Sequence, residues 1–398
     1  MRYALRPGVT AKLLLVSLAC ASCGSSGSAQ GAGGETSDSG GGSSGKPGSG
    51  GGGRPHSNGG ADSVGDAGDA GGGAGPMPNT PLGLWYGGIS LCEFTPTQLE
   101  ASADHNPQIL VPIESLTAVS DVAFDASGSA WVVGTGSDSI FRFSAASLEQ
   151  PASAKPDLVI SSTALEAPGN LAFDANGSLW VATRPASDSG TVKEGSILRF
   201  DVPDGKSGKL SLSPAAQISS MTEGDLDLIG NITFDAAQNL WVSSLVGLLR
   251  FDNPVDEKGA VTLEPSAVID KIGYTNNIHF YSVAFDSSGA LWAASADGLH
   301  YLTSVTEFAD PGSLEGRSSP EATATIKGVE DVLPAGGLAF DGSGNLWLAR
   351  ANGLVMYSDP GSLRGTVEPD ADITLTVKGD AVPSTSSHLL FVPSPTDG

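Results

Sequence analysis

From residue 81 onward, short apolar runs alternate with polar turns, and one ten-residue pattern returns five times. Each copy is an apolar run that ends in Phe-Asp, followed by a polar turn and by a Trp seven residues after the Phe. The copies are Val122–Trp131, Leu171–Trp180, Ile232–Trp241, Val283–Trp292 and Leu338–Trp347. Self-similarity at a period of about 50 residues, with several short strands per period, is typical of a β-propeller.

Each unit predicts four antiparallel strands. The apolar run before Phe-Asp indicates a buried inner strand, and the Asp-x-x-Gly that follows is typical of a tight turn. Gln238 replaces this Gly in the third copy, so we expect a different turn there. The Trp opens the second strand, and stretches such as Ile140–Phe143 and Leu158–Ile160 supply the third and fourth.

The two ends of the repeat region supply a sixth unit. Gly83–Gly88, Leu91–Phe94 and Gln108–Ile113 match the second, third and fourth strands, and His388–Val392 matches the missing first strand. This pairing of the two ends would close the ring and remove its free edges. We therefore predict an all-β, six-bladed β-propeller with four antiparallel strands per blade, and with Trp side chains packed between the blades.

The segment Pro168–Ala182 resembles the NHL repeat and the repeats of SMP-30/gluconolactonase-like and streptogramin-lyase-like propellers. The resemblance extends over nearly all of residues 81–398 and implies the propeller fold. These families range from lactonases and a lyase to binding scaffolds, so it does not imply one function. The SMP-30-like enzymes hold a divalent metal, and the lyase-like ones use a His with magnesium. Their ligands do not carry over by position, because Gly169-Asn170 here reverses the order of the SMP-30-like Pro-Asn-Gly motif.

The N-terminus predicts export. Three basic residues accompany the apolar stretch Leu13–Leu18, which is too short to span a bilayer, and small residues then lead into Cys20 and Cys23. This arrangement resembles the lipobox of bacterial lipoproteins, whose Cys becomes the acylated first residue of the mature chain. We favour Cys23 over Cys20, because a Gly/Ser tract begins directly behind it. An ordinary cleaved secretory signal is the alternative.

These features divide the chain into a signal peptide at residues 1–22, a tether at 23–80 and a propeller at 81–398. The tether is almost entirely Gly, Ser, Ala, Asp and Pro, so it has too few apolar side chains to offset the entropy of folding. We expect a disordered linker that holds a lipid-anchored propeller at the cell envelope, on the outer membrane.

The chain is strongly acidic. Its net charge of −24 becomes −27 when the signal peptide, with three basic and no acidic residues, is removed. Such a charge repels nucleic-acid phosphates and anionic lipid, which argues against nucleic-acid binding and leaves the lipid anchor as the contact with membranes. The charge serves solubility or, alternatively, attracts cations. Cys92, the only Cys of the propeller, is predicted to be a buried, inert thiol, because no His lies near it in sequence.

Alignment of the blades brings one position, three residues before each Phe, to the mouth of the central channel. It holds Asp121, Asn170, Asn231, Ser282, Gly337 and His388. Oxygen ligands with an imidazole suit a hard or borderline cation. The candidate ligands for calcium, magnesium or zinc are Asp121, Asn170, Asn231 and His388. The alternative is that these side chains cap strand starts and bind water in a wet channel.

Arg184 and Arg350 follow two of the Trp strands and should point to the same face. There they could bind a carboxylate or phosphate ligand bidentately, or instead pair with neighbouring acids. The loops of this face also carry Glu223, Asp225, Asp227, Asn276, Asn277, His279, Glu330 and Asp331. The insertion Pro185–Glu194 is a candidate lid over the face or, alternatively, a disordered loop.

We expect an exported, lipid-anchored, monomeric propeller that binds a small-molecule or protein ligand and carries out no chemistry. The alternative is a metal-dependent lactonase or a streptogramin-lyase-like enzyme, with His388 or Asp121 nearest the reaction. A purely structural envelope protein is a third hypothesis.

Overall fold

The computed structural model describes residues 82–184, 194–270, 278–297, 301–327, 329, 337–350, 353–377, 383 and 388–393. These residues all belong to the second of two compact units, Val64–Gly398. The predicted signal peptide and tether, with Cys20 and Cys23, lie outside the described residues. Among the residues that are described, no helix has the length and apolar character needed to cross a bilayer.

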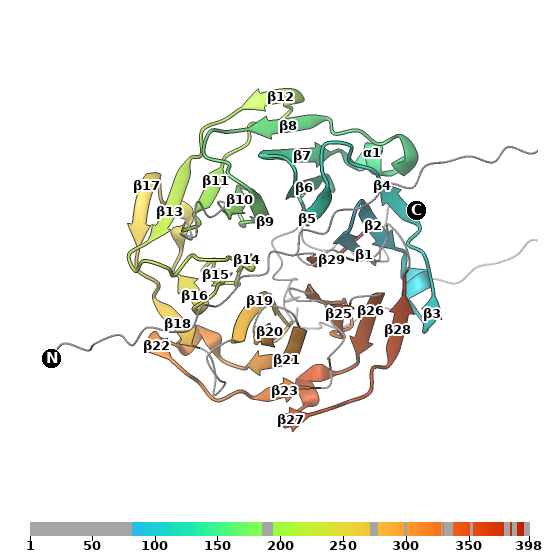
Figure 1. Cartoon of the computed structure of the whole chain (residues 1–398), viewed down its shortest axis with the longest axis vertical. Helices are drawn as coiled ribbons and strands as arrows, with labels where there is room; N and C mark the ends of the chain where they lie inside the picture. Colours follow the sequence, from blue (N-terminus) through green and yellow to red (C-terminus); the bar gives the residue numbers. More distant parts are fainter. Residues whose placement is uncertain are drawn as a thin grey trace, which may run out of the picture. The chain divides into compact units, whose positions relative to one another are not determined.

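Six β-sheets surround a central axis as the blades of a propeller, which confirms the predicted fold (Figure 1). In blade order 1 to 6, the innermost strands are β29 (Leu389–Pro393), β5 (Ala118–Phe124), β9 (Pro168–Phe173), β14 (Asn231–Phe234), β19 (Ile278–Phe285) and β24 (Leu338–Phe340). The second strands are β1 (Leu82–Gly87), β6 (Ala130–Thr135), β10 (Leu179–Thr183), β15 (Leu240–Ser243), β20 (Leu291–Asp297) and β25 (Leu346–Arg350).

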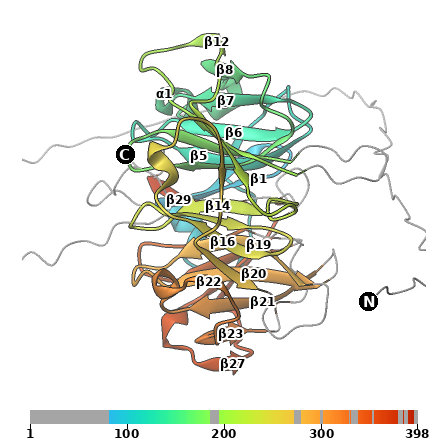
Figure 2. The same cartoon turned by 90° about the vertical axis from the view of Figure 1, so that its left-hand side faces the viewer.

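The next two strands of each blade continue the antiparallel order outward. The third strands are β2 (Leu91–Phe94), β7 (Ser139–Phe143), β11 (Ile197–Phe200), β16 (Gly247–Phe251), β21 (Tyr301–Phe308) and β26 (Gly353–Tyr357). The fourth strands are β4 (Ile109–Val111), β8 (Leu158–Ser161), β13 (Ala216–Ser220), β18 (Ala267–Asp270), β23 (Ala324–Ile326) and β28 (Ile373–Thr376). In the side view of Figure 2 the strands run from one face of the ring to the other.

Five blades carry a fifth, parallel strand that the sequence analysis did not predict. It comes from the following blade, between that blade's third and fourth strands, so each blade covers the outer edge of the one before it. On blades 2 to 6 these strands are β12 (Gly208–Ser211), β17 (Gly259–Leu263), β22 (Gly316–Ser318), β27 (Gly365–Val367) and β3 (Ala103–Asp104).

Short helices follow the third strand in five blades. They are α1 (Ala145–Leu148) and the 3-10 helices η1 (Pro96–Leu99), η2 (Pro151–Ser153), η3 (Pro254–Asp256), η4 (Pro311–Ser313) and η5 (Pro360–Ser362). The helices η1, η3, η4 and η5 precede a fifth strand, whereas α1 and η2 precede β8. In blade 1, whose described sheet has four strands, η2 contacts the outer strand β4 where the other blades have a fifth strand.

The ring is closed at two places. The C-terminal strand β29 pairs with β1, with Phe391 opposite Leu84, as the sequence predicted. The short strand β3 of blade 1 also pairs with β28 of blade 6, with Ala103 opposite Leu375. Both ends of the propeller therefore hold the ring together.

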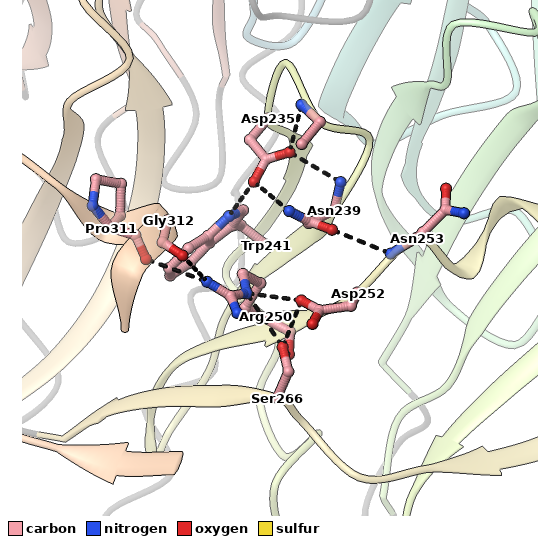
Figure 3. Close-up of polar contacts among 10 residues, drawn as sticks. Asp235, Asn239, Trp241, Arg250, Asp252, Asn253, Ser266, Pro311 and Gly312 are labelled. Atoms are coloured by element: carbon pink, nitrogen blue, oxygen red, sulfur yellow. Dashed lines mark hydrogen bonds and ion pairs between the residues drawn. The ribbon is translucent and has the colours of Figure 1, made fainter. Parts of the chain in front are cut away.

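The Asp of each repeat links the turn to the Trp. In blade 4, one carboxylate oxygen of Asp235 accepts the N–H groups of Ala237 and Asn239 at 2.9 and 2.8 Å, and the other accepts the indole N–H of Trp241 at 3.1 Å (Figure 3). The same indole bond recurs in blades 2, 3, 5 and 6 at 2.7 to 3.0 Å. Trp85 of blade 1 follows no such Asp, and its buried indole N–H has no hydrogen-bond partner among the described residues.

Gln238 does not alter the turn of blade 4, contrary to the expectation from sequence. Its φ of +66° lies close to the +76° and +79° of Gly128 and Gly177 in blades 2 and 3. Its N–H donates to the Asp235 carbonyl at 2.9 Å, as the Gly N–H does in the other turns. The side-chain Oε1 also accepts the N–H of Ala175 in blade 3 at 2.7 Å. This inter-blade bond offsets the strain of a left-handed conformation at a non-Gly residue.

The Trp side chains pack between blades, as predicted. Each is met by the Phe of the next inner strand, for example Phe124 against Trp85 and Phe234 against Trp180, with ring centroids 5.2 and 5.5 Å apart in edge-on geometry. Such pairs contribute about 0.5–1.5 kcal/mol beyond the burial of their surface. The repeated Phe and Trp therefore build the interfaces of the ring.

Candidate functional site at the channel mouth

The mouth of the channel is the end of the ring at which the six inner strands begin. Four of the aligned polar residues are almost fully buried there: Asp121 and Asn170 are 0% exposed, Ser282 1% and Asn231 2%. Two of them join neighbouring blades. Oδ2 of Asp121 accepts the N–H of Leu171 at 2.7 Å, and Oγ of Ser282 accepts the N–H of Leu338 at 3.2 Å. The aligned position therefore has a structural role that the local strand pattern did not reveal.

Asp121 of blade 2 and His388 of blade 1 are in direct contact. Nδ1 of His388 lies 2.8 Å from Oδ1 of Asp121, which also accepts the N–H of Val122 at 2.7 Å. Because a carboxylate only accepts hydrogen bonds, Nδ1 carries the proton that joins the two side chains. Nε2 of His388 is then the second ring nitrogen, and it is buried without a hydrogen-bond partner among the described residues.

Arg184, directly after β10, reaches the same level of the ring. Its Nη2 donates to Oδ1 of Asn170 at 2.7 Å and to the carbonyl of Gly230 in blade 4 at 3.2 Å. Gly169 leaves room for this side chain, because a Cβ there would lie 2.8 Å from Nε of Arg184. Burial lowers the pKa of Arg184, and the nearby charge of Asp121 opposes that shift without cancelling it.

Arg350, at the end of β25 in blade 6, has different surroundings. Burial raises the pKa of the Tyr357 hydroxyl, and the Arg350 guanidinium, which is hydrogen-bonded to it, lowers that pKa in part. Arg350 is thus paired with a tyrosine, whereas Arg184 is engaged with the aligned ring.

Four buried polar atoms at the mouth have no hydrogen-bond partner within the described part of the chain. They are Nε of Arg184, Nδ2 of Asn170, Oδ1 of Asn231 and Nε2 of His388. A buried polar group without a partner costs about 1–3 kcal/mol, so such groups are rare unless a ligand or water completes them. Because these atoms lie at one end of the axis, this place is the candidate site of the propeller.

An apolar cavity of about 90 Å³ lies on the axis and is lined in part by Asn231 and His388, two of the four residues. All six inner strands line it, and Asn231 and His388 belong both to its lining and to the polar level of the mouth. The position before the Phe is Ala in four blades: Ala123, Ala172, Ala284 and Ala339. Because these side chains are short, they leave space on the axis. This mainly apolar lining differs from the wet, polar channel that the sequence analysis considered.

Of the four residues predicted to hold a divalent cation, Asp121 and Asn170 have side-chain oxygens that already accept hydrogen bonds, whereas Oδ1 of Asn231 and Nε2 of His388 have no partner within the described part of the chain. Both carboxylate oxygens of Asp121 accept hydrogen bonds, and the side-chain oxygen of Asn170 accepts one from the charged Arg184. Calcium and magnesium need several converging oxygens, and a guanidinium repels any cation. The described residues also contain no group of three or more His, Cys, Asp or Glu side chains that could hold a metal ion. The engaged oxygens of Asp121 and Asn170 and the charge of Arg184 thus disfavour a cation here, and the cation site stays a prediction.

The acidic loop between β13 and β14 is a network of its own. Asp225, 2% exposed, accepts the Ser220 hydroxyl at 2.9 Å, and its Oδ1 lies 3.5 Å from Nη2 of Arg317. Burial, and in second place repulsion by neighbouring acids, raises the pKa of Glu194 and of Asp227. Asp225 is thus held by internal contacts, whereas Glu194 and Asp227 are close enough to other acids to be repelled by them.

Of the other polar residues expected on this face, His279 is described, whereas several others are not. Nδ1 of His279 lies 3.2 Å from the carbonyl of Leu245. Residues 185–193 of the candidate lid, with Asn276, Asn277, Glu330 and Asp331, lie outside the described residues.

The contacts of Arg184 with Asn170 and Gly230 were missed from the sequence. One signal was available, because Gly169 interrupts an otherwise apolar strand, and Gly inside a strand often marks the close approach of another group. The identity of the approaching group depends on the neighbouring blade and is not encoded locally.

The fold and the mouth together define a six-bladed propeller with buried polar groups beside an apolar channel. No protein-family model matches the sequence, and no curated protein matches it. Among solved structures, the chain is similar to the periplasmic gluconolactonase PpgL of Pseudomonas aeruginosa, with a TM-score of 0.50, 11% identity, and coverage of 78% of this chain and 99% of that one.

The chain also matches two further solved structures, at lower TM-scores. A streptogramin B lyase has a TM-score of 0.42 and 12% identity over 83% of this chain and 95% of that one. The extracellular domain of BT4673 from B. thetaiotaomicron has a TM-score of 0.42 and 17% identity. The match covers 66% of this chain and 33% of that one. At these identities the similarity shows the fold alone, and it agrees with the type of propeller predicted from the repeats.

Proposed function

We propose that this protein is an exported, lipid-anchored propeller that binds a small ligand at the channel mouth and acts as a monomeric binding module at the cell envelope. The observation that carries the proposal is the set of four unpartnered buried polar atoms beside an apolar cavity. Protein folding leaves such atoms unpaired at a cost that a bound ligand recovers.

A thermal melt of the full-length protein against small-molecule classes tests the proposal. The panel holds amides, carboxylates, phosphates and polyols, and the matched protein is the double variant Asn170→Ala with Asn231→Ala. At a hundredfold excess over Kd, a ligand stabilises the folded state by about 2.7 kcal/mol. We expect at least one class to raise the melting temperature of the parent and not that of the variant. If no class does so, the mouth is not a ligand site.

Export and anchoring are supported by the sequence of residues 1–23, with its basic start, apolar stretch and small residues before Cys23. Labelling with a radioactive fatty acid tests the anchor. We expect Cys23→Ser to abolish incorporation and Cys20→Ser to retain it. The reverse result would move the acylated position to Cys20, and labelling of neither variant nor parent would replace the anchor with an ordinary secretory signal.

An enzyme is the second candidate, because the contact between Asp121 and His388 orients a ring nitrogen toward the cavity. A carboxylate that accepts Nδ1–H leaves Nε2 of a neutral imidazole able to take a proton, which is the arrangement of a general base. The metal-dependent version of this hypothesis is disfavoured by the hydrogen bonds that Asp121 and Asn170 already accept. We place binding first, since the N–H groups of Val122 and Leu171 account for Asp121 as an inter-blade link.

Hydrolysis of simple γ- and δ-lactones, followed by acid release, separates the two candidates. A binding module shows no turnover above buffer. An enzyme shows sustained turnover by the parent protein. The variant His388→Asn should then lower the rate by two or more orders of magnitude, as expected for loss of a general base.

A further inference from the structure

We propose that the ligand of the mouth is a small neutral molecule with a primary carboxamide at one end and a short apolar chain at the other. This inference rests on the proposed binding function and specifies the chemistry that the site recognises. It follows from the donor and acceptor character of the four unpartnered atoms and from the shape of the cavity beside them.

The unpartnered atoms comprise two donors and two acceptors. Arg184 Nε can only donate, and Asn170 Nδ2 is a donor because the amide oxygen of Asn170 already faces Arg184. His388 Nε2 accepts when the imidazole is neutral, because Nδ1–H is directed to Asp121, and the fourth atom is the side-chain oxygen of Asn231. A primary carboxamide offers the complementary set in the smallest space, with two lone pairs on its oxygen and two N–H groups on its nitrogen.

The charges of the site favour a neutral ligand over an ion. Arg184 and Asp121 are close enough to influence one another and have opposite charge, so the charges of these two side chains offset each other. A carboxylate ligand would add a second buried negative charge beside Asp121, and an ammonium ligand would lie against Arg184. Either charged ligand would lose its hydration without gaining a free opposite charge in the site.

The cavity sets the length of the apolar chain. It has about 90 Å³, and its walls beyond Asn231 and His388 are chiefly alanine, valine, leucine, isoleucine and phenylalanine side chains. A cavity of about 150 Å³ accommodates benzene, so this one has room for about three or four carbon atoms. The amide group at the polar level and the chain along the axis would fill the two regions together.

Titration of the full-length protein with linear amides, followed by ligand NMR, tests the proposal. From acetamide to butanamide we expect the affinity to rise roughly fourfold per added methylene, and hexanamide to bind no more tightly than pentanamide. Three compounds with similar chains are the comparison. Butyrate is negatively charged, 1-butanol has a hydroxyl in place of the carboxamide, and N,N-dimethylbutanamide has no N–H groups. Each should bind at least tenfold more weakly than butanamide.

Two variants connect the binding to the site. Asn231→Ser replaces the amide oxygen with the hydroxyl of a shorter side chain, which draws the acceptor back from the ligand. Blade 5 has Ser at the same position, so the variant should fold, and it should lose at least tenfold in butanamide affinity. Ser282→Ala is the matched control, since its Oγ is occupied by the N–H of Leu338, and it should leave the affinity unchanged. Ala284→Val narrows the cavity and should shift the best chain length to a shorter amide.

The outcomes distinguish this inference from the function on which it rests. Butyrate binding more tightly than butanamide, or equal effects of Asn231→Ser and Ser282→Ala, would overturn the carboxamide assignment. Suppose that no amide binds, but another class of molecule stabilises the parent protein and not the Asn170/Asn231 double variant. The proposed binding function is then supported and the carboxamide assignment is wrong. If neither amides nor any other class binds, both are wrong.

Discussion

On the third strand of blades 2, 3 and 4, the side chain opposite the Trp is an Arg that contacts the next blade. In blade 4 this residue is Arg250, whose guanidinium lies 5.9 Å from the centre of the Trp241 ring and donates to the carbonyls of Pro311 and Gly312 at 3.3 and 2.9 Å (Figure 3). Blades 2 and 3 repeat the stacking with Arg142 and Arg199. Cation–π contacts of this kind contribute about 0.5–2 kcal/mol each. Arginine thus joins the aromatic layer of one blade to the outer turn of its neighbour.

Blade 5 has Glu307 at this position, opposite Trp292 and 5% exposed. Burial raises the pKa of Glu307, Arg364 partly offsets the rise, and the like charge of Asp286 adds to it. A carboxyl with a raised pKa binds its proton more tightly in the folded state. Its contribution to stability is therefore complete below the ordinary glutamate pKa of about 4.3 and is lost as the pH rises through the folded-state pKa.

We predict that Glu307→Gln stabilises the protein at pH 7 by about 1 kcal/mol, because it removes a buried charge whose Oε2 has no partner among the described residues. The gain should shrink toward zero at pH 4, where the parent carboxyl is protonated. Urea unfolding of both proteins at several pH values measures this difference. A Gln variant that is less stable than the parent at pH 7 would show that the charge of Glu307 is needed.

Sequence spacing predicted the local part of these contacts and not the long-range part. The turn between Phe124 and Trp131, and the packing of each Trp, follow from a fixed separation of seven residues. The bond from Arg250 to Gly312 spans 62 residues, and that from Asp121 to Leu171 spans 50. Their partners are backbone groups, which have no side-chain identity in the sequence. The unpartnered atoms of the mouth were unpredictable for the same reason, since burial depends on the whole ring.

At the scale of elements, the fifth strand of each blade shows how the propeller protects its outer edges. Each of these parallel strands in blades 2 to 5 begins with a Gly whose N–H donates to the preceding blade, for example Gly259 to the carbonyl of Ala215 at 2.8 Å. The sequence contains a signal for the fifth strand, because a Pro lies five residues before each of these glycines. The pairs are Pro203 and Gly208, Pro254 and Gly259, Pro311 and Gly316, and Pro360 and Gly365. The strands themselves are short and exposed, so their hydrophobic pattern is too weak to reveal them.

Gly259 has a φ of +67°, and no atom lies within 4 Å of a Cβ built on it. Gly259→Ala should therefore destabilise the protein through backbone strain alone, by about 1 kcal/mol. Gly312→Ala is the matched control, because that glycine has equal space and no positive φ, and it should change stability by less than about 0.5 kcal/mol. Chemical denaturation compares the two. Equal effects would mean that the left-handed turn is not what requires Gly at the start of the outer strand.

At the scale of the whole molecule, the ring depends on contacts between its two ends. The side chains of Leu389, Phe391 and Val392 are 5 to 8% exposed and belong to clusters that also contain residues of blades 1, 2 and 6. The sequence predicted this closure because the repeat lacked one strand at its start and had one left over at its end. It did not predict the second closure by β3, which consists of two residues.

A chain that ends at residue 387 should lose at least about 5 kcal/mol of stability, because it removes three buried apolar side chains and exposes β1 as an edge. The control chain ends at residue 393 and retains β29, so it should unfold like the parent. Circular dichroism melts of the three proteins measure the difference. Equal melting temperatures for both truncations would contradict ring closure by the C-terminal strand.

The net charge of −24 on the chain and the contacts at the mouth lead to opposite expectations about metals. The charge attracts divalent cations in general, whereas the occupied oxygens of Asp121 and the guanidinium of Arg184 oppose a specific site. A specific ion at a hundredfold excess over its Kd would add about 2.7 kcal/mol, which corresponds to about 5 °C in melting temperature for a domain of this size. We predict that calcium, magnesium and zinc, tested at constant ionic strength against sodium chloride, each shift the melting temperature by less than about 1 °C, and that the chelator EDTA has no effect. A shift of several degrees with one ion, abolished by Asp121→Asn, would restore the cation site and return the metal-dependent enzyme to consideration.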